Sequence, residues 1–207
     1  MWSFEAHARK KGFASIAGVD EAGRGPLAGP VVSAAVMLPS DWFENGLTAV
    51  GTIAIDDSKK LAPRKREILF DRIYRDAPGV GVGVVTAEEI DRTNILQAAL
   101  RSMVLAVRNL VLQPDYLLVD GLFPIPMDLP QEPIVKGDAK SISIAAASIV
   151  AKVTRDRLME CYHRQYPQYG FSSHKGYPTR AHRLAVALYG PSPIHRKTFK
   201  GVREYVE

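Results

Sequence analysis

Residues 15–38, SIAGVDEAGRGPLAGPVVSAAVML, contain two short apolar runs separated by a glycine-rich turn. The runs at 15–20 and 30–38 hold β-branched residues and are bounded by glycine or proline, which is typical of β-strands. The first run ends in two adjacent carboxylates, Asp20 and Glu21, directly before Gly-Arg-Gly. We therefore expect a hairpin-like pair of strands that begins a sheet and carries two repelling charges at its turn.

The remaining sequence predicts a mixed sheet covered by helices. Further strand-like runs occupy residues 51–57, 79–86, 115–121 and 133–138. Apolar residues at helical spacing predict helices at 63–77, 87–112, 141–162 and 179–188. Hairpin-like strands followed by alternating strands and helices are typical of an α/β fold. We expect one domain overall, with a core at 1–165 and a small, partly helical, basic C-terminal appendage at 166–207 that contributes to substrate binding.

The composition excludes several classes of protein. The 207 residues, 46% of them hydrophobic, suit one compact domain. No apolar run approaches the roughly 20 residues that cross a bilayer, and the first residues lack the apolar centre of a secretory signal. The single cysteine, Cys161, excludes an intramolecular disulfide framework and a multi-cysteine zinc site, and we expect it to be buried as a small apolar residue. A cytoplasmic location without membrane contact fits these features best.

The positive charge is concentrated in the C-terminal quarter of the chain. The net charge is +5, and residues 161–203 contain eight Lys or Arg, four of the five histidines and no Asp or Glu. Such an acid-free stretch indicates a polyanionic partner, with nucleic acid ahead of a membrane. The alternative is a basic tail that only aids solubility. His174, His182 and His195 lack nearby metal ligands in the sequence, so we expect them to contact phosphate or to lie exposed.

Three strand-like runs end in acids. Asp20 and Glu21 end the first run, and Asp120 and Asp138 end two later ones. Ligands gather at the carboxyl ends of strands in open α/β sheets, so we expect these acids to meet. Adjacent buried carboxylates repel unless a cation compensates, and four acids would hold two ions such as Mg²⁺ about 3.5–4 Å apart, as in phosphodiester cleavage. Taken singly, Asp120 also suits a turn and Asp138 a helix cap.

The turn GRGPLAG, residues 23–29, is similar to two phosphate-binding motifs and matches neither. A dinucleotide fingerprint requires its last glycine one position earlier, and a Walker loop requires Gly-Lys-Ser/Thr. Two interpretations remain open. In the first, Gly23 and Gly25 let the backbone approach a ligand closely while Arg24 binds phosphate. In the second, the turn only joins two strands and Arg24 neutralises an adjacent acid.

Five blocks of the sequence, taken in order, match one known family. The blocks are GVDEAGRGPLAGPVV at 18–32, DDSKKL at 56–61, LLVDG at 117–121, KGDAKSISIAAASIVAKVTRD at 136–156 and HKGYPTRAH at 174–182. Together they resemble the type 2 ribonucleases H, specifically bacterial ribonuclease HII, over nearly the whole chain. The resemblance implies a ribonuclease H-like fold, with a central five-stranded mixed sheet flanked by helices.

The resemblance also implies an activity. The family consists of metal-dependent endoribonucleases that hydrolyse the RNA strand of RNA–DNA hybrids and cut 5′ to single ribonucleotides embedded in duplex DNA. The implied cofactor is Mn²⁺ or Mg²⁺, two ions per active site during turnover. The family's metal-binding catalytic acids fall on Asp20, Glu21, Asp120 and Asp138. The implied partner is nucleic acid, and we expect a monomer without a sliding-clamp partner because no clamp-binding motif is visible.

Other positions that match the family are implied to bind substrate. The backbone of Gly23, Arg24 and Gly25 would sense the 2′-hydroxyl that distinguishes RNA from DNA, and Tyr177 would pack on the deoxyribose after the ribonucleotide. Weaker candidates for contact with phosphate or the nucleic-acid backbone are Lys59, Ser141, Ser143, Ser148 and Lys175. The serines suit capping or packing of a helix equally well, and a loop lysine at position 59 also suits solvent.

Two rival functions share parts of this pattern. A nucleic-acid-binding module without catalysis is expected to lack one or more of the metal acids, and all four are present. A different nuclease or strand-transfer enzyme on the same fold shares clustered acids but not the combination of Gly-Arg-Gly with HKGY. The basic tail fits all three functions, so it does not discriminate among them.

Overall fold

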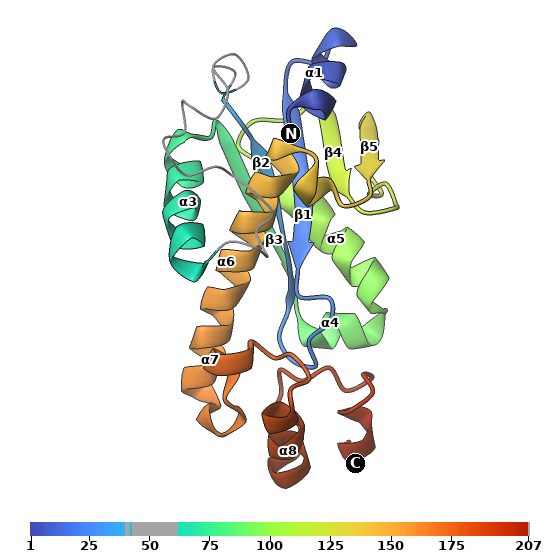
Figure 1. Ribbon diagram of the computed structural model, residues 1–207. Coiled ribbons are helices and arrows are strands. Elements are labelled where there is room, and N and C mark those ends of the chain that lie inside the picture. The colour runs from blue at the N-terminus through green and yellow to red at the C-terminus, as the bar shows by residue number, and fades with distance from the viewer. Residues whose placement is uncertain (40–41, 43–61, 207) are drawn as a thin grey trace.

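A five-stranded mixed sheet forms the centre of the molecule (Figure 1). The computed structural model describes residues 1–39, 42 and 62–206, so the strand expected at 51–57 and Lys59 lie outside the described residues. The strands are β1 (Ile16–Ala22), β2 (Val31–Met37), β3 (Gly79–Val85), β4 (Tyr116–Asp120) and β5 (Gln131–Ile134). Their order is β3-β2-β1-β4-β5; β2 runs antiparallel to both of its neighbours, β1 and β3, and β4 and β5 run parallel to β1. The expected α/β fold with a five-stranded mixed sheet is confirmed.

The two central parallel strands end side by side. Val19 of β1 pairs with Val119 of β4, so the next residues, Asp20 and Asp120, reach the same edge of the sheet. Both strands consist of buried side chains up to that edge. The register of the sheet therefore places two acids together, although 100 residues separate them in the chain.

Helices cover both faces of the sheet (Figure 1). The helices of the described residues are α1 (Ser3–Lys10), α3 (Pro63–Asp76), α4 (Ala87–Arg92), α5 (Ile95–Arg108), α6 (Ile142–Gln165), α7 (Phe171–His174) and α8 (Arg180–Tyr189), with 3₁₀ turns η2 (Gly137–Ala139), η3 (Pro167–Tyr169) and η4 (Arg203–Tyr205). On one face α3 and α6 pack against Ala34 and Val36 of β2, and on the other α5 packs against Ala35 and Met37. The alternation of β2 side chains thus divides two apolar cores. Within the described residues, no helix has the length and apolar character to cross a membrane.

The alanine-rich helix α6 lies very close to β1. Its three consecutive alanines at 145–147 are fully buried. A Cβ added to Gly18 of β1 would stand 2.1 Å from the carbonyl carbon of Ser143, so only glycine permits this approach. The close packing brings Ser148, further along α6, within hydrogen-bonding reach of Asp20.

Two expected elements have different bounds. The helix expected at 87–112 is divided into α4 and α5, because the side chain of Asn94 accepts a 3.0 Å hydrogen bond from a backbone N–H three residues later and begins a new helix. The strand expected at 133–138 lies earlier in the chain, as β5. It is followed by η2, which the chain enters through Lys136 at φ 56°. Asp138 therefore lies in a 3₁₀ turn rather than at the end of a strand.

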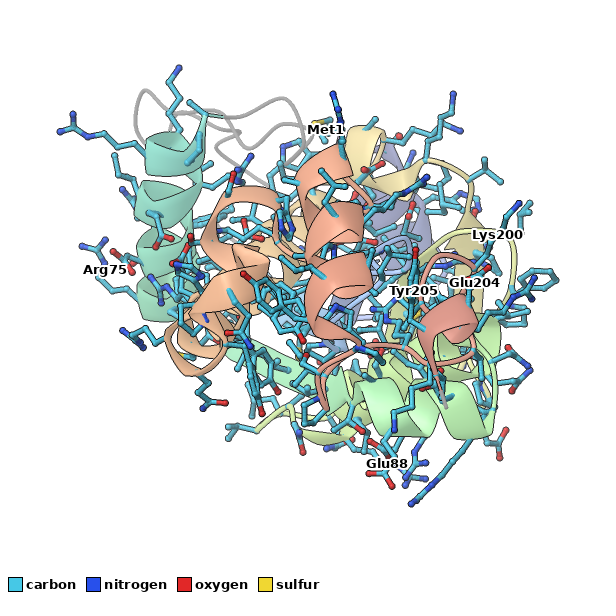
Figure 2. The ribbon with its side chains drawn as sticks, turned by 90° about the horizontal axis from the view of Figure 1, so that it is seen from below. Met1, Arg75, Glu88, Lys200, Glu204 and Tyr205 are labelled. Atoms are coloured by element: carbon cyan, nitrogen blue, oxygen red, sulfur yellow. The ribbon has the colours of Figure 1, made fainter. Side chains whose placement is uncertain are left out.

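The C-terminal segment is bound to the turn that follows β1. Ala28 forms an antiparallel bridge with His195, and the Leu27 N–H donates a 2.8 Å hydrogen bond to the Gly176 carbonyl oxygen. The segment lies beyond one end of the sheet (Figure 1), and Figure 2 shows this end from below, with α8 in front. The last quarter of the chain therefore contacts the residues that follow Asp20 and Glu21 of β1.

Several residues have the opposite exposure from the one expected. Cys161 is exposed, so the expectation of a buried side chain was wrong; it lies near the end of α6, where the helix extends past the sheet (Figure 1). His182 and His195 are 0% and 1% exposed and pack against the ring of Phe171, so the expectation of solvent or phosphate contact was wrong for both. Arg196, part of the basic stretch, is also fully buried.

Candidate active site

Three acidic side chains meet where β1 and β4 end. Asp20 and Glu21 of β1 and Asp120 of β4 each offer a carboxylate oxygen, and these oxygens lie within 4.8 Å of one another. Asp20 is only 3% exposed, and its Oδ1 accepts a 2.7 Å hydrogen bond from the Glu21 N–H. Asp120 Oδ1 accepts a 2.6 Å hydrogen bond from the Gly137 N–H. Strand register and backbone hydrogen bonds thus hold the acids in place.

The proximity of the acids changes the protonation of Asp20. Burial, and then the charges of Glu21 and Asp120, raise the pKa of Asp20 well above its ordinary value of 3.8. Hydrogen bonds from the Ser148 hydroxyl and the Glu21 N–H act in the opposite direction. A cation bound among the carboxylates would relieve the repulsion, and hard divalent cations prefer such oxygen ligands. The three acids therefore fit a divalent metal ion.

Asp138 does not join this group in the structure. Its side chain is 5% exposed, and it contributes no oxygen to the set that lies within 4.8 Å. Because the chain turns at Lys136 after β5 has ended, η2 meets the acids through the Gly137 N–H instead. Three of the four expected acids are thus brought together, and the fourth lies next to the residue that binds Asp120.

A pocket of about 500 Å³ lies beside the acids. Its walls come from the turn after β1, from α3 and α6 and from the loop after α7, and its lining residues are Glu21, Ala22, Gly23, Arg24, Gly25, Arg66, Ser148, Lys152, Arg155 and Tyr177. One acidic and four cationic side chains therefore line a single hollow. This combination suits a phosphate backbone that approaches a metal ion.

The Gly-Arg-Gly turn forms one wall of the pocket. Gly23 has φ +100°, and a Cβ there would lie 2.1 Å from Arg155 Nε, so no other residue fits without displacement. The Arg24 side chain is half exposed, and its Nη1 lies 3.3 Å from Glu21 Oε1. The structure thus agrees with the second interpretation of the sequence in that Arg24 pairs with an adjacent acid. Gly23, Arg24 and Gly25 also line the pocket, so contact of the turn with a ligand stays a prediction.

Two buried arginines hold this turn. Arg155 of α6 donates hydrogen bonds of 3.0 Å to the carbonyl oxygen of Pro30, directly after the turn, and of 3.1 Å to that of Ala28, and one of 3.0 Å to the carbonyl oxygen of Lys175. Arg196 donates to three further carbonyl oxygens of the turn at 2.5–3.1 Å. Burial, and then the charge of Arg155, lower the pKa of Arg196 to about 9. The two guanidinium groups exchange water for main-chain oxygens, which restrains the turn.

Tyr177 lies against the Gly-Arg-Gly turn. Its ring is near enough to meet a Cβ added to Gly25, at 3.7 Å, and the side chain is 43% exposed. The Arg155 guanidinium lies 6.0 Å from the ring centroid. An exposed aromatic face beside a restrained backbone suits packing against a nucleotide. Two motifs that the sequence places more than 150 residues apart therefore form one wall.

The weaker phosphate candidates separate into two kinds. Ser148 lines the pocket and binds Asp20. Lys175 is not among the lining residues; it forms an ion pair with Glu160 and donates a 2.5 Å hydrogen bond to the Ser172 carbonyl oxygen. Contact between Lys175 and phosphate would therefore require the loss of its present partners.

Ser141 and Ser143 are buried away from the pocket. Their hydroxyls donate hydrogen bonds of 2.5 and 2.7 Å to Glu5 Oε1, which also accepts the Ser143 N–H at 3.1 Å. The Glu5 carboxylate thus occupies the N-terminus of α6, where the helix dipole would otherwise favour phosphate. Helix α1, which carries Glu5, was not among the expected elements, so the structure moves Ser141 from a substrate contact to an interior one.

Three cationic lining residues were missed by the sequence predictions. On α6, Lys152 and Arg155 follow Ser148 at four and seven positions, which places all three on one helix face. On α3, Arg66 precedes the buried Leu69 by three positions, so it belongs to the inward side of that helix. Helical spacing relative to known inward residues was the signal that would have found them.

Comparison with known proteins agrees with the geometry of the site. Residues 17–202 match the family model described as Ribonuclease HII. Ribonuclease HII of Geobacter sulfurreducens is 57% identical over 206 residues, which cover 100% of this chain and 91% of the relative. The crystal structure of ribonuclease H2 from Pyrococcus horikoshii is similar with a TM-score of 0.76 and 31% identity, covering 93% of this chain and 97% of that one. RNase HII of Archaeoglobus fulgidus, solved in complex with PCNA, gives 0.71 and 28%, covering 90% and 96%. The chain belongs to the ribonuclease HII family of endoribonucleases.

Proposed function

We propose that this chain hydrolyses the RNA strand of RNA–DNA hybrids and also cuts duplex DNA on the 5′ side of a single embedded ribonucleotide. Family membership supports the ribonuclease H activity. The observation that carries the finer proposal is that the acids and the wall formed by Gly23–Gly25 and Tyr177 share one pocket. Metal-binding acids beside a wall that would contact one sugar suit a substrate in which a single ribonucleotide determines the position of cleavage.

The acids Asp20, Glu21 and Asp120 would hold the divalent cation, Mn²⁺ or Mg²⁺. We include Asp138 as a fourth carboxylate and two ions during turnover. A bound cation would lower the pKa of the attacking water and offset the charge that develops at the cleaved phosphate. The chain's own part is to fix the acids through the register of β1 and β4 and through the hydrogen bond that Ser148 donates to Asp20.

Recognition of the ribonucleotide is proposed to rest on the rigid backbone of the Gly-Arg-Gly turn. The main chain of Gly23–Gly25 would bind the 2′-hydroxyl, the one group that distinguishes the ribonucleotide. Arg196 holds that main chain through the carbonyl oxygens of Gly23 and Arg24, so its conformation is set before substrate binds. Arg155 holds the chain further along, through the carbonyl oxygens of Ala28 and Pro30. Tyr177 would pack on the deoxyribose that follows.

The neighbouring phosphates are proposed to bind the cationic wall of the pocket. Arg24, Arg66 and Lys152 reach it from the turn, α3 and α6 respectively. Lys59 and Lys175 are additional proposed contacts, the first outside the described residues and the second only after it leaves Glu160. The buried Arg196 is excluded from direct contact and acts from within the protein.

The alternative function is a nucleic-acid-binding module without catalysis. A binding surface gains nothing from a buried Asp20 whose pKa is raised by burial and by the charges of Glu21 and Asp120, because such a cluster costs stability unless a metal is bound. The acids therefore favour the enzyme. We expect the chain to work as a cytoplasmic monomer in the removal of ribonucleotides from DNA, without a sliding clamp.

The test is a cleavage assay on end-labelled duplex DNA that contains one ribonucleotide. We expect a nick 5′ to the ribonucleotide with Mn²⁺ or Mg²⁺ and none with EDTA. The same duplex with deoxyribose at that position is the matched control and should stay intact. Cleavage of a long hybrid without cleavage of the single-ribonucleotide duplex would reject the finer proposal. Binding without any cleavage would favour the module.

A further inference from the structure

A cluster of three histidines lies directly behind the loop that carries Tyr177. The rings of His174 (α7) and His182 (α8) stack with centroids 4.4 Å apart and an interplanar angle of 18°. His182 Nε2 lies 3.0 Å from Nε2 of His195. The rings of Tyr169 and Phe171 enclose the cluster. The proposed reaction uses none of these histidines.

The hydrogen-bond partners determine which nitrogen of each ring carries the proton. The Ser192 N–H donates to His195 Nδ1 at 2.9 Å, so the proton of His195 lies on Nε2 and is donated to His182. His182 Nε2 is then an acceptor, and its proton lies on Nδ1. That N–H donates to the carbonyl oxygen of Tyr177 at 3.0 Å. One directed series of hydrogen bonds thus runs from Ser192 to Tyr177.

The third ring holds the residue before the tyrosine. His174 Nδ1 accepts a 3.2 Å hydrogen bond from the Gly176 N–H, and its Nε2–H donates to the Tyr169 carbonyl oxygen at 2.8 Å. Gly176 in turn accepts the N–H of Leu27 from the turn after β1. The loop is therefore fastened to the histidines on one side and to the turn on the other.

We propose that His182 is a positioning residue for Tyr177, whose main chain it holds through Nδ1–H in a tautomer selected by His195. This inference rests on the proposed role of Tyr177 at the ribonucleotide. The Tyr177 ring is substantially exposed, so its place beside Gly25 depends on where the backbone is held. The arrangement requires uncharged rings, because a proton on both nitrogens of His182 would set two donors against each other at 3.0 Å.

The first test measures the tautomers in the unmodified protein. Long-range ¹H–¹⁵N correlation spectra of the ¹⁵N-labelled chain at pH 7.5 distinguish Nδ1–H from Nε2–H histidine. We expect Nδ1–H for His182 and Nε2–H for His174 and His195. An Nε2–H or a doubly protonated ring at His182 would overturn the proposal without recourse to any variant.

The second test compares two replacements of His182. His182→Asn keeps an N–H donor near the position of Nδ1, whereas His182→Leu removes the donor at similar size. We expect kcat/KM on the single-ribonucleotide duplex, divided by kcat/KM on a long hybrid, to fall by about three- to tenfold in the leucine variant, as for the loss of one buried hydrogen bond. The asparagine variant should recover most of that ratio. An unchanged ratio, or an equal loss in both variants, would overturn the proposal.

A double-mutant comparison separates positioning from general damage. In a Tyr177→Ala background, His182→Leu should change the substrate ratio no further, because the ring that it positions is gone. Independent, multiplicative losses would overturn the proposal. If the unmodified chain fails to nick the single-ribonucleotide duplex, the proposed function fails first and the positioning role fails with it. If the unmodified chain nicks this duplex normally but the two substitutions reduce the substrate ratio independently, only the positioning role is rejected.

Discussion

Arg196 Nη1 donates a 2.8 Å hydrogen bond to the carbonyl oxygen of Arg24, which precedes it by 172 residues. The same guanidinium binds the carbonyl oxygens of Gly23 and Gly29. A fully buried cation near the C-terminus therefore shapes the turn that lines the pocket. Part of the basic stretch acts on the site from inside the protein, and only its exposed members remain candidates for contact with nucleic acid.

Arg196→Lys should lower the free energy of unfolding by about 2–4 kcal/mol, because a single ammonium group leaves carbonyl oxygens of the turn without a donor. Urea unfolding followed by circular dichroism measures the change. Arg203→Lys alters an arginine whose side chain is 61% exposed, and this matched control should shift the value by less than about 0.5 kcal/mol. A loss at position 196 no larger than at position 203 would contradict the restraining role.

Asp20→Asn should abolish cleavage and stabilise the metal-free protein. The neutral side chain keeps its size but removes a buried charge repelled by Glu21 and Asp120, which we expect to raise the free energy of unfolding by about 1–2 kcal/mol. Cleavage should fall by at least about a thousandfold, since a metal ligand is lost. Anisotropy of a labelled hybrid in EDTA should show binding that is retained.

The matched control for this variant is Asp71→Asn, an exposed acid of α3. It should leave both cleavage and stability unchanged. Full cleavage by Asp20→Asn would contradict the three-acid site. A lower free energy of unfolding for metal-free Asp20→Asn than for the unmodified protein would show that a group other than a metal ion compensates the charge of the acids.

The sequence predicts that Asp20, Glu21 and Asp120 meet, because the ends of buried strands are local features. Asp20 and Asp120 each follow a short apolar run, and parallel pairing of β1 with β4 then brings them together. The earlier end of β5, at Ile134 instead of residue 138, was not predictable in the same way, because the left-handed Lys136 and the 3₁₀ turn after it leave no periodic pattern. Asp138 was therefore placed at a strand end that does not exist.

The larger errors come from contacts between distant segments. The capping role of Ser141 is readable from its position before a helix, but its partner Glu5 lies 136 residues earlier. Similarly, His182 and His195 read as surface residues in a basic stretch. Their burial follows from the bridge between His195 and Ala28, which no local pattern encodes.

The buried histidines predict sensitivity to acid. Burial lowers the pKa of His182 to about 4 and that of His195 to about 3, from the ordinary 6.5. Between pH 6.5 and those values the unfolded chain binds more protons than the folded one, so the free energy of unfolding falls as the pH falls. We expect a loss of about 2–3 kcal/mol between pH 6.5 and 5. Asp20, whose pKa is raised, acts in the opposite direction.

Urea unfolding at a series of pH values checks this dependence. His195→Gln should flatten the curve below pH 6.5, because one of the protons taken up on unfolding is removed; His174, whose pKa burial also lowers, keeps part of the slope. His7→Gln changes an exposed histidine of α1 and should leave the slope unchanged. Asp20→Asn removes the opposing contribution of Asp20, so a stability of this variant that does not change between pH 6.5 and 5 would show that the cluster is charged or open in solution.

Arg66→Ala should weaken binding of hybrid and duplex alike and reduce the slope of log affinity against log salt by about one, as for the loss of one phosphate contact. Its neighbour Arg64 is exposed and does not line the pocket, so Arg64→Ala is a control of equal charge change. Anisotropy at several salt concentrations in EDTA measures both. Equal effects of the two variants would show that Arg66 contributes only to the overall electrostatic potential of the protein and does not contact a phosphate.

Tyr177→Ala should impair cleavage at a single ribonucleotide more than cleavage of a long hybrid. The ring beside Gly25 is the exposed aromatic surface of the pocket wall, and loss of one packed aromatic contact is worth about 1–3 kcal/mol, or about five- to a hundredfold in rate. Tyr189→Ala removes another exposed tyrosine, from the end of α8, and should alter neither rate. Single-turnover cleavage of both substrates by both variants decides the point. A long hybrid can be cut at many ribonucleotides, whereas the duplex can be cut at only one, so a residue that recognises the junction should matter more for the duplex. An equal loss of rate on the two substrates would therefore assign Tyr177 to general binding of nucleic acid. Recognition of the ribonucleotide would then rest on the Gly-Arg-Gly backbone alone.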